Sequence, residues 1–546
     1  MLRFWTLLGI FALFSDAIEA QLMEPFRIEP GPSVNATRGE PWPQPYRIIE
    51  GYGFRLLRPS VFRMLVTGET CDILEDAVQR YTRIVMTEAR AAVRLLGSRR
   101  RRHARRDPLF AGDIVALEIR LINPCENLPH LGMNESYILD VPEDSDTGTL
   151  VSNSIWGILR GLETFTHILT ASGDGPNLAV KCRTVIDEPL FPHRGLLLDT
   201  SRHYLPVLDI LLTLDGMSYN KMNVLHWHIV DDNSFPYQSI RFPELSAKGA
   251  YHPSMVYTPD DVTKVIEYAR LRGIRVVPEF DTPGHTRSWG QSHPELLTTC
   301  YDTSTGEPDG TLGPLDPTAA KLYPFLRELF AEIVAAFPDR YIHLGGDEVP
   351  FDCWASNPNI RDYMRRRGMN DTYQLLEEEY VEGLLNITET LGASPVVWQE
   401  VFDNGVKLNP ETVVHVWTGN QMTKLASVTK AGFHALLSTC WYLDHIAGGG
   451  DWLKFYSCDP LAFPSTSEQR RLVLGGEACM WGESVDRTNV HPRIWPRASA
   501  AAERLWSHDR SPSISYAARR LEEHTCRMNR RGIPAQPPNG PGFCVL

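Results

Sequence analysis

The sequence predicts an α/β protein, a (β/α)₈ barrel preceded by a smaller α+β domain. The chain of 546 residues is too long for one ordinary domain. From about residue 191 onward, eight short apolar runs alternate with helical stretches. Each run also gives way to polar or aromatic residues at its C-terminal end, which is the end of a barrel strand that carries an active site. The length and these two patterns together favour the barrel.

The first 20 residues predict a signal peptide. Arg3 precedes an apolar run over 4–14, and Ala17 and Ala20 are small residues suited to cleavage. The run is shorter than the roughly 20 residues of a membrane span, and charged residues interrupt every later apolar run, so we expect no stable membrane insertion. Four glycosylation sequons agree with the secretory pathway, at Asn35, Asn134, Asn370 and Asn386.

Residues 21–190 predict the smaller α+β domain. Apolar spacings of three and four indicate a helix over 71–96, alternation indicates a strand over 113–122, and a second helix is expected over 152–169. The arginine-rich segment 98–106 lies between the first two elements. We interpret it as a solvated loop, with a proteolytic processing site as the alternative.

Residues 191–546 predict the barrel. Continuous apolar strands that alternate with helices are typical of parallel strands covered by helices. An open doubly wound sheet is the alternative, but no GxGxxG motif follows the first run. The eight runs cover 194–202, 221–231, 272–281, 341–348, 394–400, 412–419, 433–439 and 472–481.

Charge and cysteine usage exclude several classes of protein. The formal net charge of −13 argues against nucleic-acid binding. The ten cysteines include no CxxC motif, so we expect neither a zinc nor a redox centre. In an oxidising compartment most should pair. Spacing suggests Cys71–Cys125, Cys300–Cys353 and Cys526–Cys544; Cys440 and Cys458 could close one more loop, and Cys182 and Cys479 could stay reduced.

Three tryptophans lie at the ends of predicted strands and indicate a sugar-binding pocket. Trp398, Trp417 and Trp481 offer aromatic walls on which the apolar C–H faces of a sugar can stack. Tyr442, just beyond the seventh run, adds a hydroxyl group. Charged side chains that suit sugar hydroxyls are Arg202, at the end of the first run, and Glu483, just beyond the eighth.

Asp347 and Glu348, in HLGGDE, are the sharpest local signal for chemistry. Carboxylates at the end of a buried strand are costly unless they are paired or used, and Gly345 and Gly346 are expected to leave space for a ligand. Glycosidic cleavage normally needs two carboxylates that flank the bond. Neighbours in a strand point to opposite sides. We therefore expect either that another strand supplies the second carboxylate or that the substrate supplies the nucleophile.

Histidines near this pair suit proton transfer better than metal binding. His226 and His228 share one face of a strand, but no HExxH motif is present, so we predict no metal site. His285 follows the third run on a tight loop. Held by Asp231, it could tune proton transfer at the acid.

Seven motifs resemble those of the family 20 glycoside hydrolases, the β-N-acetylhexosaminidases, and most closely the animal lysosomal subunits. The motifs read DTSRHYLP, NVLHWHIVDD, PEFDTPGHT, HLGGDEV, VVWQEVFD, WYLD and GGEACMWGE, and the resemblance as a whole extends from Trp42 to Cys544. The resemblance implies a substrate-assisted retaining mechanism, an exception to the two-carboxylate scheme. It also implies a glycan or glycolipid substrate, no cofactor, a homodimer or heterodimer, and a lysosomal location, with secretion or the cell surface as alternatives.

The resemblance also implies a role for each site residue. Glu348 matches the general acid/base, and Asp347 matches the residue that orients the substrate's acetamido group. Tyr442 would bond to the acetamide oxygen, and Asp231 and His285 would form a relay behind Glu348. Binding of the sugar ring and its hydroxyls would fall to Trp398, Trp417, Trp481, Arg202 and Glu483.

Asp444 is expected near the sugar's 6-position. A carboxylate there accepts a bond from a neutral hydroxyl and repels a sulfate or a sialic acid. Of the two animal subunit types, Asp444 resembles the one that acts on neutral substrates. His445 departs from that pattern, since a protonated imidazole would offset part of the repulsion in an acidic compartment.

Overall fold

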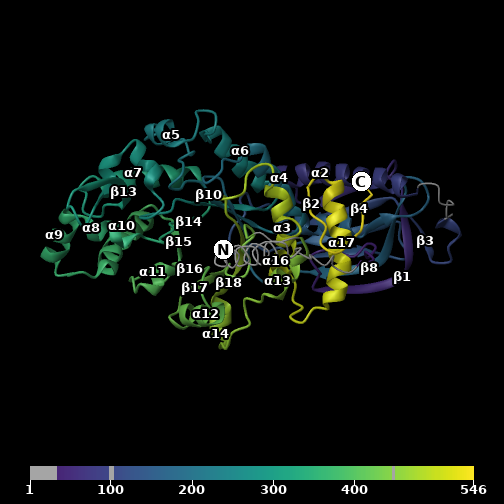
Figure 1. The fold of residues 1–546 in the computed structure, drawn as a ribbon. Helices are drawn as coiled ribbons and strands as arrows, with labels where there is room; N and C mark the ends of the chain where they lie inside the picture. The colour runs from purple at the N-terminus through teal and green to yellow at the C-terminus, as the bar shows by residue number, and fades with distance from the viewer. Residues whose placement is uncertain (1–32, 97–103, 446–448, 546) are drawn as a thin grey trace, which may run out of the picture.

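The computed structural model describes residues 33–96, 104–445 and 449–545, and places a sheet domain beside a barrel (Figure 1). The predicted signal peptide lies outside the described residues. So does most of the arginine-rich segment 98–106, of which the described part forms the short 3-10 helix η1 (Ala104–Arg106). In the described ranges, no helix is long and apolar enough to cross a membrane.

The first domain is a mixed sheet covered by two helices. Its strands run in the order β2-β4-β6-β5-β8-β1-β3, with β7 on β8. The predicted strand over 113–122 is two strands, because β3 pairs with β1 whereas β4 pairs with β2 and β6. The elements are β1 (Arg47–Leu57), β2 (Arg63–Gly68), α2 (Asp72–Leu96), β3 (Phe110–Ile114), β4 (Ala116–Leu121), β5 (Tyr137–Val141), β6 (Thr147–Ser152), α3 (Ile155–His167), β7 (Leu169–Ala171) and β8 (Leu178–Asp187).

The second domain is a closed barrel of eight parallel strands, so the predicted fold class is confirmed. Each of the eight apolar runs contributes one strand. In barrel order the strands are β10 (Val224–His228), β11 (Arg275–Glu279), β14 (Tyr341–His343), β15 (Ser394–Trp398), β16 (Val413–Val416), β17 (His434–Leu437), β18 (Val473–Met480) and β9 (His193–Asp199).

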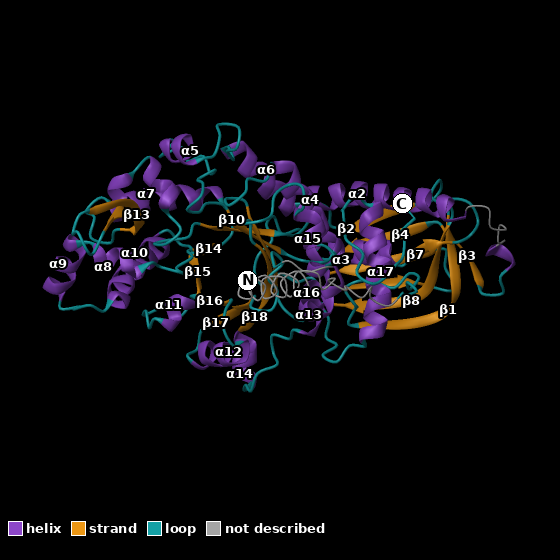
Figure 2. Ribbon diagram, viewed as in Figure 1, coloured by secondary structure: helices purple, strands orange, loops and turns teal. Residues whose placement is uncertain are grey.

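Helices and short connections surround the barrel (Figure 2). A hairpin of β12 (Leu297–Tyr301) and β13 (Pro308–Leu315) extends beyond it. The helices are α4 (Val207–Tyr219), α5 (Glu244–Gly249), α6 (Pro259–Arg270), α7 (Leu322–Ala336), α8 (Phe351–Ser356), α9 (Pro358–Arg367), α10 (Tyr373–Thr390), α11 (Gln399–Asp403), α12 (Gln421–Lys430), α13 (Trp452–Ser457), α14 (Ser467–Leu472), α15 (Val490–Ile494), α16 (Arg497–Trp506) and α17 (Ile514–Arg530), with 3-10 turns η2 (Arg287–Gln291), η3 (Pro294–Leu296) and η4 (Gly449–Asp451).

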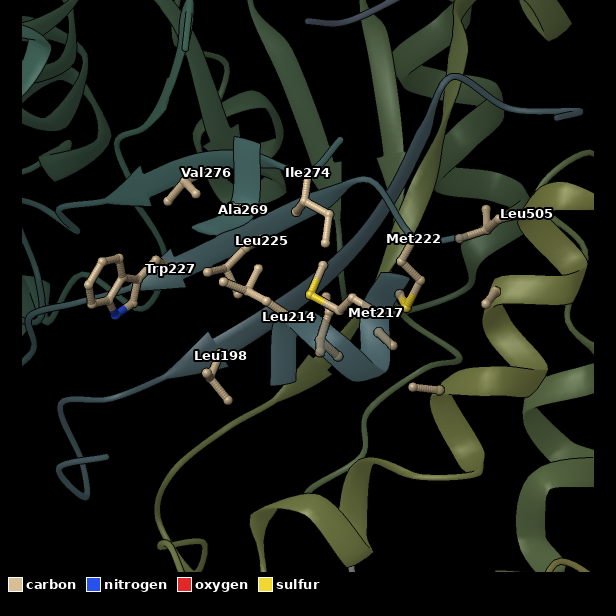
Figure 3. Close-up of a cluster of buried hydrophobic side chains, with 14 of the residues drawn as sticks. Leu198, Leu214, Met217, Met222, Leu225, Trp227, Ala269, Ile274, Val276 and Leu505 are labelled. Atoms are coloured by element: carbon tan, nitrogen blue, oxygen red, sulfur yellow. The ribbon is translucent and has the colours of Figure 1, made fainter. Parts of the chain in front are cut away.

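The core between the strands and the helices is apolar. Figure 3 shows Leu198 of β9, Leu225 of β10 and Val276 of β11 beside Leu214 and Met217 of α4. All five side chains are buried. Because successive residues of a strand point to opposite sides, the other faces of these strands are free to carry polar groups into the barrel.

The C-terminal helix α17 packs against the first domain, and side chains of the two domains form ion pairs and hydrogen bonds with each other. Arg530 forms an ion pair with Glu88 of α2 (2.8 Å), and Arg531 forms one with Glu163 of α3 (2.6 Å). Trp42, before β1, is fully buried and donates from Nε1 to the Ser499 carbonyl of α16 (3.0 Å). The proposed domain boundary near residue 190 falls between β8 and β9.

Disulfides close four loops in the described part of the chain. The pairs are Cys71–Cys125, Cys300–Cys353, Cys440–Cys458 and Cys526–Cys544. Cys182 and Cys479 are unpaired and buried. The four sequon asparagines Asn35, Asn134, Asn370 and Asn386 are exposed, as a glycosylation acceptor must be, and their modification stays a prediction.

Candidate active site

Asp347 and Glu348 follow β14 in a tight loop rather than continuing the strand, which ends at His343. Gly345, Gly346 and Glu348 have φ angles of +71°, +95° and +49°, in the left-handed region. The alternation of an extended strand therefore does not apply. It is the turn that sends the two carboxylates apart: Asp347 is 8% exposed, whereas 61% of the Glu348 side chain is exposed.

The two glycines admit neighbouring side chains, so the expectation that they leave space for a ligand was wrong. A Cβ atom on Gly345 would lie 1.6 Å from Asp281 Oδ1, and one on Gly346 would lie 2.4 Å from Val401. The Gly346 N–H donates to Asp281 Oδ1 (2.9 Å). Both glycines are thus required for Asp281, which follows β11, and Val401 of α11 to pack against the loop.

Asp347 is a buried carboxylate whose neighbours are also acidic. Its Oδ1 has no hydrogen-bond partner among the described residues. Burial, followed by the charge of Asp347, raises the pKa of Asp281 well above its usual range, so Asp281 holds its proton. Burial and the Asp347 charge also raise the pKa of Glu400 to about 7.

The structure brings the predicted relay residues together behind Glu348. His285 Nε2 lies 3.7 Å from Glu348 Oε2, and His285 Nδ1 lies 3.3 Å from Asp231. Burial alone would lower the pKa of His285, but Asp231 and Asp347 raise it to about 9. His285 is therefore a cation at neutral and acidic pH, close enough to interact with a carboxylate at Glu348.

Arg202 lies on the same rim, held by two carboxylates. It forms ion pairs with Asp199 (3.1 Å) and Asp231 (2.9 Å). Its guanidinium carbon lies 5.0 Å from the ring centre of Trp481. Glu483 is exposed and helps to raise the pKa of Arg202, although burial opposes the shift. The predicted pair of polar anchors is therefore close enough to interact.

The predicted aromatic residues form one cluster. Trp398 is 1% exposed, and Trp417, Tyr442 and Trp481 are partly buried around it. The ring centres of Trp398 and Trp417 are 6.4 Å apart in an edge-to-face arrangement, and those of Trp398 and Trp481 are 5.9 Å apart. Trp417 and Tyr442 stack at 6.1 Å. Trp398 ends β15 and the other three rings follow β16, β17 and β18, so four neighbouring strands bring the rings together.

Asp444 and His445 follow Tyr442 at the edge of this cluster. Asp444 is partly buried, and its Oδ1 has no hydrogen-bond partner among the described residues. Burial raises its pKa. His445 is exposed, with Nε2 4.0 Å from Asp444 Oδ2. Glu483 also raises the pKa of Asp444, which places the two carboxylates on the same side of the site.

Sequence reasoning missed Glu279, the last residue of β11. It is completely buried and accepts a hydrogen bond from Trp398 Nε1 at 2.7 Å. It also lies within ion-pair distance of three histidines, His226, His228 and His343. Its position at the end of the third apolar run, in PEFD, was the signal that could have identified it.

Three buried histidines inside the barrel, His226, His343 and His415, bring ring nitrogens within 4.8 Å of one another. Metal coordination requires nitrogen lone pairs that converge in the planes of the rings. The His226 and His343 rings are instead stacked, with centres 4.5 Å apart and planes at 24°. The arrangement fits ring stacking better than a metal site.

Two family models match the chain. "Glycosyl hydrolase family 20, catalytic domain" covers residues 191–509, and "beta-acetyl hexosaminidase like" covers 41–168. The human protein "Beta-hexosaminidase subunit beta" is 47% identical over 537 residues, which are 97% of this chain and 93% of the relative. The bovine "Beta-hexosaminidase subunit alpha" is 49% identical over 482 residues, 87% of this chain and 88% of the relative.

Solved structures of similar fold agree with these family matches. The Flavobacterium johnsoniae chitobiase has a TM-score of 0.76 and 29% identity, with 90% of this chain and 73% of that chain covered. An exo-β-N-acetylglucosaminidase from Vibrio harveyi has the same TM-score at 22% identity, over 94% of this chain and 81% of that one, and supports the fold. With a catalytic-domain model over more than half of its length and relatives near 50% identity, the chain belongs to family 20 of the glycosyl hydrolases.

Proposed function

We propose that this glycoside hydrolase removes terminal, non-reducing β-linked GlcNAc and GalNAc residues by a substrate-assisted retaining mechanism. Its curated relatives are named as β-hexosaminidase subunits, and the 29% identical solved structure is named as a chitobiase. The observation that carries the proposal is the buried Asp347 Oδ1, a carboxylate oxygen with no partner among the described residues. The N–H of a 2-acetamido group would supply that partner.

The reaction begins with proton donation by Glu348. Its exposed carboxyl group gives a proton to the glycosidic oxygen while the acetamide carbonyl oxygen attacks C1. The C1–O bond breaks, the alcohol leaves, and an oxazolinium ring forms. Asp347 accepts the acetamide N–H and stabilises the positive charge of that ring, and the Tyr442 hydroxyl donates to the acetamide oxygen to orient it.

The second half uses the same groups in reverse. Glu348, now a carboxylate beside the His285 cation, takes a proton from water. The water attacks C1 from the side that the leaving group vacated, so the configuration is retained and the acetamide is restored. Trp398, Trp417 and Trp481 hold the ring and the acetamido methyl, while Arg202 and Glu483 bind the hydroxyls.

A protein nucleophile is the competing mechanism, with Glu400 or Glu483 as the candidates. Trp417 Nε1 donates to Glu400 Oε2 (2.7 Å), and the pKa of Glu400 is raised to about 7 by burial. A carboxyl group that holds its proton at acidic pH is a poor nucleophile. Glu483 is exposed and lies beside Arg202, on the hydroxyl side of the site.

The test combines an inhibitor with an acid/base variant. We expect a thiazoline analogue of the oxazolinium ring to inhibit strongly, and Glu348→Gln to lose about 10³-fold or more in kcat on substrates with poor leaving groups. Glu382→Gln, an exposed glutamate on α10, is the control and should act as the wild type. Normal turnover in Glu348→Gln, or a trapped glycosyl–protein adduct, would contradict the mechanism.

Asp444 supports a preference for neutral substrates at the 6-position. We expect neutral GlcNAc to be hydrolysed faster than its 6-sulfated form, with the difference narrowing at acidic pH as the raised pKa of Asp444 allows its protonation. Comparable rates at pH 7 would contradict this assignment. A glycoprotein glycan or a glycolipid as substrate, a dimeric state and a lysosomal location are further parts of the proposal.

A further inference from the structure

Glu279 is a buried carboxylate that contacts both halves of the active site without reaching the reacting atoms. We propose that Glu279 is a positioning residue that couples the tryptophan floor of the pocket to the acid/base Glu348 through a buried chain of histidines and carboxylates. The inference rests on the proposed role of Glu348. It assigns to the reaction a side chain that is 0% exposed and lies at the end of β11.

One carboxylate oxygen of Glu279 binds Trp398, the tryptophan that we place at the floor of the pocket. Its Oε1 accepts from Trp398 Nε1 at 2.7 Å and lies 3.2 Å from His343 Nδ1. The Trp398 ring stacks on His415 with centres 4.3 Å apart, and its centre lies 4.6 Å from that of His343. A hydrogen bond to a charged acceptor is stronger than a neutral one. Glu279 therefore sets the orientation of the indole on which the sugar rests.

The other oxygen begins a path to the acid. Strand register pairs Glu279 with His228 of β10, whose Nδ1–H donates to Glu279 Oε2 at 2.6 Å. His228 Nε2–H donates to Asp231 Oδ2 at 2.8 Å. Asp231 lies 3.3 Å from His285, which in turn lies 3.7 Å from Glu348. Two histidines and one aspartate thus join Glu279 to the group that moves the proton.

The same oxygen extends the chain away from the substrate. His226 Nε2 lies 2.9 Å from Glu279 Oε2, and His226 Nδ1 lies 2.7 Å from Glu477 Oε2. Glu477 Oε1 meets His193 Nε2 at 2.6 Å. Glu477 therefore resembles Glu279 in burial and in its histidine partners, but in the described part of the chain it forms no hydrogen bond or ion pair with His228 or Trp398.

Charges alternate along this chain. Burial alone would raise the pKa of Glu279, but His343, His228 and His226 hold it well below its usual range. Against the lowering effect of burial, the neighbouring carboxylates raise the pKa of His226 to about 9 and that of His228 to about 10. Burial lowers the pKa of His193, His343 and His415. The titratable and charged groups that face the chain are Asp199, Arg202, Asp231, Arg275, Asp281, Asp347 and Glu477.

The charge of Glu279 keeps His228 protonated, and this protonation affects Glu348. In Glu279→Gln, the amide N–H can donate to His228 Nδ1, so a neutral His228 still donates from Nε2 to Asp231. The hydrogen bonds persist while one cation near the acid and one anion farther away are lost. The potential at Glu348 becomes more negative, which makes its carboxyl group a weaker proton donor.

The experiment compares Glu279→Gln with the matched control Glu477→Gln on two classes of substrate. One substrate has an activated nitrophenol leaving group that hardly needs a proton, and the other is a disaccharide that does. For Glu279→Gln we expect the loss of kcat/KM on the disaccharide to exceed that on the phenol by about tenfold or more. The alkaline limb of the pH profile should move up by about half a unit or more.

Glu477→Gln should lower thermal stability without changing the leaving-group dependence or the pH limb. Equal losses on both substrates in Glu279→Gln, or identical behaviour of the two variants, would overturn the inference. Wild-type turnover and thiazoline inhibition test the proposed function independently, so the two failures are distinguishable.

Folding of the variants is checked first by thermal melting. If Glu279→Gln does not fold, His228→Gln tests the chain from its next member, because the amide still donates to Asp231 but carries no charge. It should reproduce the leaving-group dependence, and a folded His228→Gln with wild-type leaving-group dependence would also overturn the inference. Glu279→Asp, which keeps the charge on a shorter side chain, should recover part of the disaccharide activity.

Discussion

Carboxylates on the rim of the barrel differ from those in its interior in how their oxygens are satisfied. On the rim, Asp347 is buried with a free Oδ1, and most of the Glu348 side chain is exposed. In the interior, Glu279 accepts hydrogen bonds from Trp398 and His228, and Glu477 forms hydrogen bonds with His193 and His226. Glu135, which lies between β4 and β5 of the first domain, is also fully paired. Its carboxylate forms ion pairs with Arg160 (2.8 Å) and Arg194 (2.5 Å).

This difference in pairing indicates which carboxylate oxygens are available to accept a hydrogen bond from a ligand, namely those on the rim. Buried polar groups in native proteins nearly always have partners, so an unpartnered carboxylate lowers stability unless it serves another purpose. Rim substitutions should therefore affect turnover more than stability. Substitutions of the paired interior carboxylates Glu135 and Glu477 should do the opposite, because each would leave a buried cation unpaired. Glu279 is the exception, because its chain of hydrogen bonds reaches Glu348.

The largest effect is expected at Glu135, which joins the first domain to the barrel. Glu135→Ala leaves the buried guanidinium groups of Arg160 and Arg194 without their anion. We expect the free energy of unfolding to fall by about 3–5 kcal/mol, measured by urea denaturation, with kcat of the folded fraction unchanged. Glu382→Gln is the control. A stable Glu135→Ala with impaired turnover would break the comparison between rim and interior.

Asp347→Asn should show the reverse pattern. Loss of the anion that stabilises the oxazolinium ring should lower kcat by about 10²–10³-fold. The melting temperature should stay equal or rise, because the substitution removes the repulsion that raises the pKa of Asp281. Steady-state kinetics and thermal melting of the same preparation measure both quantities. A large loss of stability without loss of kcat would show that Asp347 stabilises the fold, as the paired interior carboxylates do, and does not act in the reaction.

The smallest effect concerns Glu377 on α10, a buried carboxyl behind the rim. Burial raises its pKa from 4.5 to about 7. A carboxyl whose folded pKa is raised contributes stability that is complete below its unfolded pKa and is lost as the pH rises through the folded pKa. Stability should therefore decline between pH 4.5 and pH 7.

Glu377→Gln keeps an acceptor for Asn404 Nδ2, which lies 2.8 Å from the carboxylate, and removes this titration. We expect its melting temperature to exceed that of the wild type by about 1–3 °C at pH 7.5 and to match it at pH 4.5. The same difference at both values would mean that burial of the charge is not the cause.

Much of the site was predictable because strand ends in a barrel share one rim. The sequence placed Trp398, Trp417, Trp481 and Asp347 at the ends of apolar runs, and the closed barrel brings them together. It could not predict that Gly345 and Gly346 accommodate Asp281 and Val401, because those contacts join segments that are far apart in the chain. The break at Val115 was also invisible, since it depends on which strands pair.

The sequence by itself determined the periodic alternation of apolar runs and helices, and the residue types that follow each run. These depend on local spacing, which fixes the face of an element on which a side chain lies. Only the tertiary structure decided the state of each ionisable group. Glu279 is an ordinary glutamate in the sequence, and it becomes a link between Trp398 and His228 because the two neighbouring strands β10 and β14 bring three histidines to it in the interior of the barrel.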